Sequence, residues 1–209
     1  MREHPLFDEA ARKRIEEAVR RAEAKSSAEI VPVVVDRSDA YPEAQDRGAI
    51  AALILATVVM WFAFPELPRW EFVLVQALAL PVGWFAGAFE PLARLLIGRR
   101  ALDSMARWRA EVAFREEGLT RTKGGTGVLV FASLFEHEVV ILGDRPVHEK
   151  VGDAGWREAV SLLVGGIKAN KPADGFVDAI DRLGEQLATH FPKGPDDHGD
   201  ELPNRLTIR

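Results

Sequence analysis

Two long apolar stretches without a single charge dominate the pattern of hydrophobic and polar positions along the chain. They cover residues 48–64 and 72–89, and only the link PELPRWE separates them. A helix needs roughly 20 residues to cross the hydrocarbon core of a bilayer, with about 17 as the lower limit. Each stretch therefore predicts a membrane-spanning helix, and the link predicts the turn of a transmembrane helical hairpin.

Aromatic side chains gather at both ends of these stretches, as they do at the two interfaces of a membrane protein. The turn end holds Trp61, Phe62, Phe64, Trp70 and Phe72, and the other end holds Trp84, Phe85 and Phe89. A soluble core is the alternative, because a buried helix can be apolar on all sides. Two adjacent helices of this kind without any charge are uncommon in soluble proteins, so the pattern favours the membrane.

The distribution of arginine predicts how the hairpin is oriented. The link holds one basic residue, Arg69, whereas the flanking segments hold Arg37, Arg47, Arg94, Arg99, Arg100, Arg107 and Arg109. The positive-inside rule places the arginine-rich side in the cytoplasm. The first 47 residues are highly charged and contain no apolar signal-peptide core. We therefore expect a two-helix protein of the bacterial inner (cytoplasmic) membrane, with both termini and the polar domain in the cytoplasm.

The remaining chain alternates between helical and strand patterns. Periodicity predicts helices over residues 7–25, from 42 into the membrane, 102–117, 154–169 and 174–191, an interfacial helix end over 91–100, and strands over 28–35, 127–134 and 138–144. Pro32 cannot donate a ladder hydrogen bond, so the first strand is expected at an edge or at a bulge. Residues 193–209 are rich in Pro, Gly and Asp, which predicts a disordered tail.

These elements predict an α/β fold with a small mixed sheet flanked by helices. The membrane hairpin is inserted between the first strand and the rest of the domain. The expected divisions are residues 1–47 for the first helix and strand, 48–99 for the hairpin and its interfacial segment, 100–192 for the rest of the domain, and 193–209 for the tail.

Composition excludes several classes of function. The net charge is −5, which argues against a nucleic-acid partner. The chain has no cysteine, so structural disulfides and thiolate metal sites are ruled out. Its five histidines show no i,i+3 or i,i+4 pairing, which argues against a zinc site.

The segments AEIVPVVV, TGVLVFASLFEHEVVILGD and VGDAGW together resemble the TPM domain family. The resemblance covers about residues 6–192 without the hairpin and is strongest over 125–156. It implies a TPM-like fold. The family includes a thylakoid-lumen protein with acid-phosphatase activity, a photosystem repair factor and an animal receptor-auxiliary protein, so it implies no single reaction. The internal hairpin departs from the common pattern and resembles the family's bacterial membrane subgroup.

Polar residues after the first and last predicted strands are candidate metal ligands. Asp36, Ser38 and Asp39 follow the first strand, and Asp144 ends the last one. If these strands are parallel, their carboxyl ends share one sheet edge, and the oxygen ligands there suit Ca²⁺ or Mg²⁺. A metal in that position would polarise a phosphate ester. The same residue types also serve as helix caps and turn formers, which is the simpler interpretation.

The loop TRTKGGTG is a candidate anion site because it combines Arg121 and Lys123 with three glycines. It lacks the Gly-Lys-Ser/Thr ending of a P-loop and precedes a strand, so a flexible strand entry is the simpler interpretation. Glu136, His137 and Glu138 are expected to be solvated turn residues. Trp108 and Trp156 are expected to be core residues.

Two functions remain. The first is a non-catalytic binding or assembly module held at the cytoplasmic membrane face, with the lipid bilayer and another membrane protein as partners. The alternative is a metal-assisted, acid-phosphatase-like hydrolase that uses Asp36, Asp39 and Asp144. The sequence contains no catalytic triad or cofactor loop, which favours the first, and whether the protein is an enzyme stays open.

Overall fold

The computed structural model describes residues 5–194 and 201–209. Its contacts divide the chain into two compact units, one formed by the residues up to Ser38 with Ala106–Arg209, and the other by Asp39–Met105. Helix α5 (Arg99–Glu116) begins in the second unit and ends in the first. The inserted segment therefore begins after Ser38 and ends before Ala106. The boundaries expected from the sequence were residues 47 and 100.

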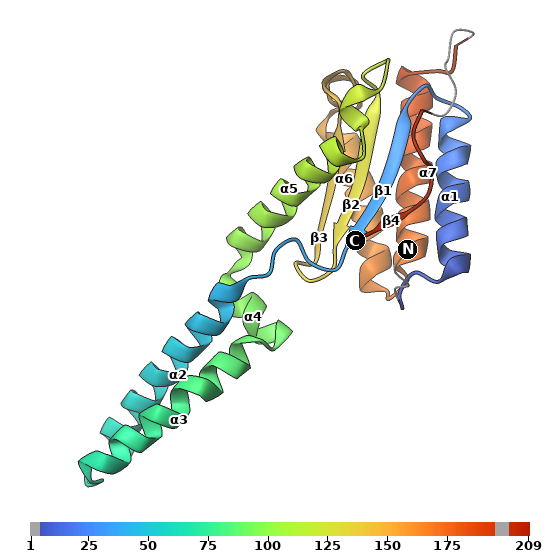
Figure 1. The fold of residues 1–209 in the computed structure, drawn as a ribbon. Helices are drawn as coiled ribbons and strands as arrows, with labels where there is room; N and C mark the ends of the chain where they lie inside the picture. The colour runs from blue at the N-terminus through green and yellow to red at the C-terminus, as the bar shows by residue number, and fades with distance from the viewer. Residues whose placement is uncertain (1–4, 195–200) are drawn as a thin grey trace. The chain divides into compact units, whose positions relative to one another are not determined.

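The first unit contains a four-stranded mixed sheet in the order β3-β2-β1-β4 (Figure 1). Its strands are β1 (Glu29–Val35), β2 (Gly127–Ser133), β3 (Glu138–Gly143) and β4 (Thr207–Ile208). β1 is parallel to both β2 and β4, whereas β2 and β3 form an antiparallel pair. The predicted mixed α/β fold is thus confirmed, and β1 and β3 are antiparallel to each other.

Both faces of the sheet are covered, which explains why β1 and β2 are continuous runs of buried residues. One face packs against α1 (Glu9–Glu23), α6 (Arg145–Lys168) and α7 (Pro172–His190) in a core that includes Ile30, Val34, Phe176 and Leu183. The opposite face packs against Ala110, Ala113 and Phe114 of α5 and against Leu119 of the 3-10 helix η1 (Leu119–Arg121).

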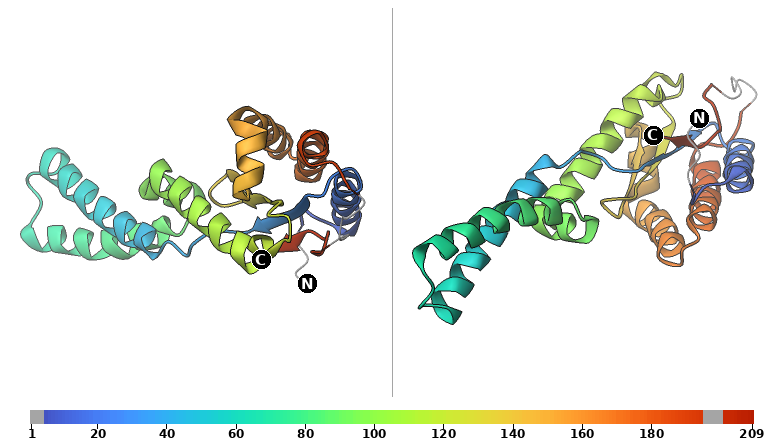
Figure 2. Two further views of the ribbon diagram at one scale, coloured as in Figure 1. Left: turned by 90° about the horizontal axis from the view of Figure 1, so that it is seen from above. Right: turned by 60° about the horizontal axis from the view of Figure 1, so that its bottom comes forward.

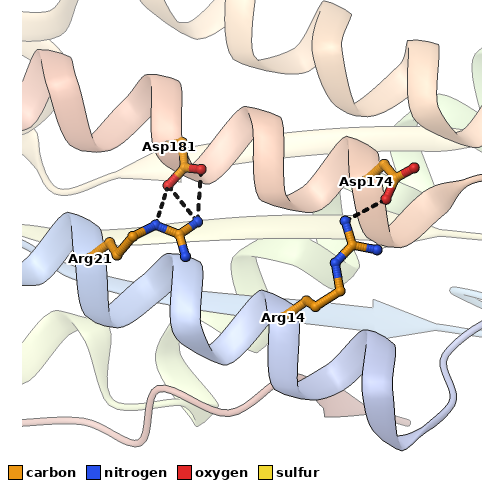
Figure 3. A network of polar contacts seen from close by, with 4 residues as sticks. All are labelled: Arg14, Arg21, Asp174 and Asp181. Carbon is orange, nitrogen blue, oxygen red and sulfur yellow. Dashed lines mark hydrogen bonds and ion pairs between the residues drawn. The ribbon is translucent and has the colours of Figure 1, made fainter.

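Ion pairs tie the outer sides of α1 and α7 together (Figure 3). The Arg21 guanidinium donates to both carboxylate oxygens of Asp181 at 2.8–3.0 Å, and Arg14 Nη2 lies 2.6 Å from an Asp174 oxygen. All four side chains remain substantially exposed to solvent. The packing beneath them, rather than these pairs, therefore supplies most of the stabilisation between the helices.

The hydrogen bonds on the β4 side of β1 explain why the strand tolerates Pro32, which has no amide hydrogen. Backbone groups of alternate residues point to the same side of a strand, and the Val34 carbonyl and Asp36 amide bond to Arg209 on this side. The Ile30 amide on the same side is capped by the buried Glu23 carboxylate at 2.9 Å. Pro32 lies between Ile30 and Val34, before the start of β4, and has no amide to satisfy. β1 is an inner strand, so the expected edge position is wrong, and Pro32 is tolerated because the short β4 does not pair with it.

The prediction of a disordered tail is wrong for residues 201–209, which include β4. The buried Glu29 carboxylate accepts hydrogen bonds from the amides of Glu201 and Leu202 at 3.1 Å each. Asn204 and Leu206 are also buried. These contacts are long-range in sequence, so the local composition did not reveal them. Residues 195–200 of the predicted tail lie outside the described residues.

The second unit consists of α2 (Pro42–Ala63), α3 (Arg69–Gly87), α4 (Glu90–Ile97) and the first turns of α5. α2 and α3 run side by side as an antiparallel hairpin in both views of Figure 2. They approach closely at Gly48, Gly83 and Gly87, where an added Cβ would lie within 2.4–2.5 Å of a backbone oxygen of the facing helix. The small residues of α3 are therefore used within the hairpin itself.

Candidate functional site

Three buried polar residues meet at the carboxyl ends of β1 and β2, the sheet edge where ligands of α/β proteins usually bind. Ser38 follows β1, Ser133 ends β2, and Glu136 comes from the β2–β3 turn. The exposed fractions are 9% for Ser38 and 2% for each of the other two. We refer to these three residues as the Ser–Ser–Glu cluster.

Hydrogen bonds connect every member of the cluster. The Ser38 amide donates to Glu136 Oε1 at 2.8 Å, and the hydroxyl oxygens of Ser38 and Ser133 are 2.8 Å apart. The Ser133 hydroxyl donates to the other carboxylate oxygen of Glu136. Each Glu136 carboxylate oxygen thus accepts a hydrogen bond, which lowers the cost of burying the group.

The cluster holds Ser38 in place, and Ser38 is where the first segment of the first unit ends and the inserted segment begins. Backbone bonds from Leu134 to Val35 and from Phe135 to Asp36 continue the β1–β2 ladder beyond the strand ends. The Arg37 guanidinium stacks 4.3 Å from the centre of the Phe135 ring. The expectation that Glu136 is a solvated turn residue is therefore wrong. The sequence carries no clear signal for this contact, because it joins two side chains across a β-turn and a third residue that is remote in sequence.

The predicted pairing of Asp36 with Asp144 is wrong because it required β1 and β3 to be parallel. β3 runs antiparallel to β2, so Asp144 lies at the opposite edge of the sheet from Asp36. There the Asp144 carboxylate accepts from the Gly127 amide at 3.2 Å and from the Thr122 hydroxyl at 3.3 Å. Asp144 thus acts as a local cap for the loop before β2.

The other two candidate ligands do not converge with Asp144 either. Ser38 belongs to the buried cluster, and the Asp39 carboxylate accepts from the amide of its neighbour Ala40 at 2.7 Å. Among the residues that the structure describes, no group of three or more His, Cys, Asp or Glu side chains is placed to hold a metal ion. The Ca²⁺ or Mg²⁺ hypothesis therefore loses its geometric basis at this set of residues.

Several amides in the loop with Arg121 and Lys123 already have acceptors within the protein, and the Lys123 amide donates to Glu201 Oε2 at 3.3 Å. The Gly125 amide donates to the Thr122 carbonyl at 3.1 Å, and the Thr126 amide donates to the Thr122 hydroxyl at 3.2 Å. The Gly127 amide is engaged by Asp144. Amides of this kind are the donors that a phosphate cradle would offer, and here they already have acceptors within the protein. Arg121 and Lys123 themselves are exposed, and their anion-binding role stays a prediction.

The largest apolar surface lies on α2 and α3, which are the two described helices long and apolar enough to cross a membrane. Only 17% of the most apolar window of α2 and 11% of that of α3 is buried within the protein. The exposed residues are bulky and include Ile54, Leu55, Val58, Trp61, Phe62, Val73, Leu78, Val82 and Phe85.

One polar contact lies inside this apolar hairpin. Gln76 Nε2 donates to the Thr57 hydroxyl at 2.9 Å, and that hydroxyl donates to the Leu53 carbonyl of its own helix at 2.8 Å. The pair thus joins the two helices, whereas Gln76 Oε1 is buried and accepts no hydrogen bond. Trp156 is buried as expected, whereas Trp108 is 56% exposed on α5, so its assignment to the core is wrong.

Comparison with known proteins supports the fold alone. No protein-family model and no curated protein matches the sequence. The chain is similar to the NMR structure of the BA42 protein from the psychrophilic bacterium Bizionia argentinensis, with a TM-score of 0.61 and 21% identity. The match covers 100% of this chain and 99% of that chain.

Proposed function

We propose that the α2–α3 hairpin spans a membrane and holds the α/β unit at its surface as a binding or assembly module. The observation that carries the proposal is the low burial of two helices without a charged residue between Gly48 and Phe64 or between Phe72 and Phe89. A core helix of a soluble protein would hide these side chains within the fold. Burial in lipid is the alternative that accounts for so many exposed aliphatic and aromatic residues.

The dimensions of the hairpin are near the lower limit for a membrane crossing. α2 has 22 residues and α3 has 19. Their uncharged parts, residues 48–63 and 72–87, correspond to about 24 Å each at the helical rise of about 1.5 Å per residue. The hydrocarbon core is about 30 Å thick. The Gln76–Thr57 bond supports a position in the membrane, because a polar side chain in lipid requires a partner on a neighbouring helix.

The arginine distribution supports placing the α/β unit in the cytoplasm and the α2–α3 turn on the far side. Arg69 is the only basic residue of the turn, whereas Arg47, Arg94, Arg99 and Arg100 flank the other end. The protein would then be a two-helix component of the bacterial inner membrane. Its membership of the TPM family, with the hairpin inside the domain, is part of the same proposal.

The geometry of the candidate residues favours binding over hydrolysis. A metal-assisted phosphatase would need converging carboxylates, yet Asp36 and Asp144 lie at opposite sheet edges, and Glu136 is engaged by Ser38 and Ser133. An aryl phosphate assay with Ca²⁺ or Mg²⁺ tests this point. We expect the rate of the wild-type chain to equal that of Asp144→Asn. Metal-dependent hydrolysis that this substitution abolishes would restore the enzyme alternative.

The anchor is tested by alkaline carbonate extraction of membranes that contain the full chain. We expect the chain to remain in the pellet. Leu55→Lys/Leu78→Lys places charges on side chains that are 64% and 66% exposed, and we expect it to reduce insertion because a charge in lipid is costly. Leu162→Lys on the partly exposed face of α6 is the matched control and should leave extraction unchanged. Release of the wild-type chain into the supernatant would contradict the anchor.

A further inference from the structure

We propose that α4 is an interfacial helix that lies in the headgroup layer of the membrane, where arginines bind phospholipid phosphates. This inference rests on the proposed membrane hairpin and adds a second lipid contact to it. α4 starts three residues after α3 ends and lies beside the end of the hairpin away from the turn (Figure 1). It would therefore meet the bilayer near its surface.

The residues of α4 divide into three sides. Ala93 and Ile97 are buried, with 5% and 6% exposed, on the side that faces the hairpin. Leu95 lies on the opposite side and is 76% exposed, and the half-buried Leu92 and Leu96 extend this apolar arc toward the buried side. Arg94 and Glu90 lie between the two on the remaining flank. This separation of an apolar arc from a polar flank is the pattern of helices that lie in a membrane interface.

The apolar arc continues the exposed apolar surface of the hairpin. Phe89, immediately before α4, is 66% exposed, and Phe85 near the end of α3 is 69% exposed. Water would contact all of these side chains in a soluble protein. The hydrocarbon edge of a bilayer covers them without any additional protein partner.

Arginines within and just after α4 are the groups that would bind phosphate. Between Glu90 and Asp103 every charged residue is an arginine, namely Arg94, Arg99 and Arg100. Arg99 lies 3.6 Å from Asp103 but keeps 75% of its side chain exposed. The acidic residues Glu43 and Asp46 lie on the first turns of α2, before its apolar stretch. A guanidinium offers two parallel donors that match a phosphate group.

The anchorage of α4 is built into the second unit. Arg47 Nη1 of α2 donates to the carbonyls of Leu96 and Ile97 at 2.8 and 3.1 Å. These carbonyls end α4 and would otherwise lack helical partners. Gly98, with φ of +87°, then turns the chain toward α5. The arc of leucines is therefore held in a defined orientation relative to the hairpin.

The test uses depth-dependent fluorescence quenching in the full chain, which contains no cysteine of its own. Single cysteines at Leu78, Leu95 and Glu149 are labelled with an environment-sensitive fluorophore, and the proteins are reconstituted in phosphatidylcholine vesicles with phosphatidylglycerol. Quenchers sit either deep in the acyl chains or near the headgroups. We expect the Leu78→Cys probe to be quenched by the deep quencher, the Leu95→Cys probe by the shallow one, and the Glu149→Cys probe by neither.

The outcomes separate this inference from the proposed function. A lipid-quenched Leu78→Cys probe with a water-exposed Leu95→Cys probe would overturn the interfacial helix and leave the membrane hairpin standing. A water-exposed Leu78→Cys probe would overturn both. Circular dichroism of each labelled protein verifies that it is folded.

A second arm tests the phosphate ligand by measuring how strongly the purified chain retains phosphatidylglycerol over phosphatidylcholine in native mass spectra. We expect Arg94→Gln/Arg99→Gln/Arg100→Gln to lower this preference several-fold, because each arginine contributes to the attraction of anionic lipid. The matched control, Arg157→Gln/Lys168→Gln/Lys171→Gln on the α/β unit, should retain it. An equal preference in both triple variants would overturn the role of these arginines.

Discussion

Gly48 and Gly83 lie so close together across the α2–α3 hairpin that a methyl group added at either Cα would fall 2.4 Å from the carbonyl oxygen of the other. Real Cβ atoms do not approach a backbone oxygen this closely, so the two helices can keep this contact only while both positions are glycine. The hairpin thus packs through backbone contacts on its inner side and presents its large apolar side chains outward.

Gly83→Ala should force the two helices apart. Overpacking of a tight contact costs about 1–3 kcal/mol, and here the obstructing atoms belong to backbone and cannot rotate away. Unfolding of the purified chain in mixed detergent micelles containing dodecyl sulfate, followed by circular dichroism, measures the loss. Ala51→Leu on the exposed side of α2 is the control and should unfold like the wild type. Equal midpoints for Gly83→Ala and Ala51→Leu would contradict the close packing.

Glu136→Ala should destabilise the α/β unit, because the Ser38 amide and the Ser133 hydroxyl would lose their buried acceptor. Leaving such a donor unsatisfied costs about 1–3 kcal/mol. Glu136→Gln keeps an acceptor for the Ser38 amide and should cost less. Urea unfolding of the full chain in detergent, followed by the fluorescence of Trp156 and the other tryptophans, measures both variants.

The control for Glu136 is Asp178→Ala, which removes an exposed carboxylate from α7. Surface substitutions of this kind usually change stability by no more than about 0.5 kcal/mol. If Glu136→Ala and Asp178→Ala behaved alike, the Ser–Ser–Glu cluster would have no structural role.

The Arg21–Asp181 pair should contribute little despite its good geometry (Figure 3). Its side chains are 51% and 44% exposed, and ion pairs of this kind contribute about 0.2–1 kcal/mol. A double-mutant cycle with Arg21→Ala and Asp181→Ala isolates the coupling energy, which should decrease as salt is added. A coupling energy well above this range that is insensitive to salt would contradict the account.

Acid should loosen the segment that contains β4. Burial alone would raise the pKa of Glu116, but hydrogen bonds and charge attraction from Arg109 and Arg209 outweigh it and lower the pKa below its usual 4.5. A lowered pKa means that the ionised carboxylate stabilises the folded state above pH 4.5. This contribution is lost as the pH falls through the lowered value. Stability of the docked segment should therefore decline below pH 4.5.

The measurement is the exchange protection of the Arg209 amide, which donates to the Val34 carbonyl at 3.0 Å. In the wild type we expect its protection factor to decrease as the pH is lowered below 4.5. In Glu116→Gln, which cannot titrate, we expect a lower protection factor that changes little with pH. A similar decline in both proteins would assign the pH dependence to another group.

The sequence predicted the parts of this fold that have long or strongly patterned segments. The apolar stretches appear as α2 and α3, and the runs of Val and Ile appear as β1, β2 and β3, because these patterns extend over many residues. α6 was predicted from residue 154 but begins at Arg145, since the left-handed Gly152 interrupts the helical pattern. β4 has only two residues, so neither alternation nor length distinguished it from a loop.

The candidate site was harder to predict because it depends on strand direction. Residue patterns identify a strand but not the direction in which it runs in the sheet. That direction alone decides whether Asp36 and Asp144 lie at the same edge of the sheet or at opposite edges. Glu136 is polar and lies in a tight turn, which normally indicates exposure. Its burial follows from the partner groups of Ser38 and Ser133, and Ser38 is remote from it in sequence.

Cysteine accessibility tests the membrane hairpin most directly. Glu66→Cys marks the α2–α3 turn and Glu149→Cys marks the α/β unit of the otherwise cysteine-free chain. With an impermeant maleimide and intact spheroplasts, we predict that Glu66→Cys is labelled at once and Glu149→Cys only after permeabilisation. The reverse pattern would contradict the orientation alone. Labelling of both cysteines on the same side of the membrane would contradict the hairpin.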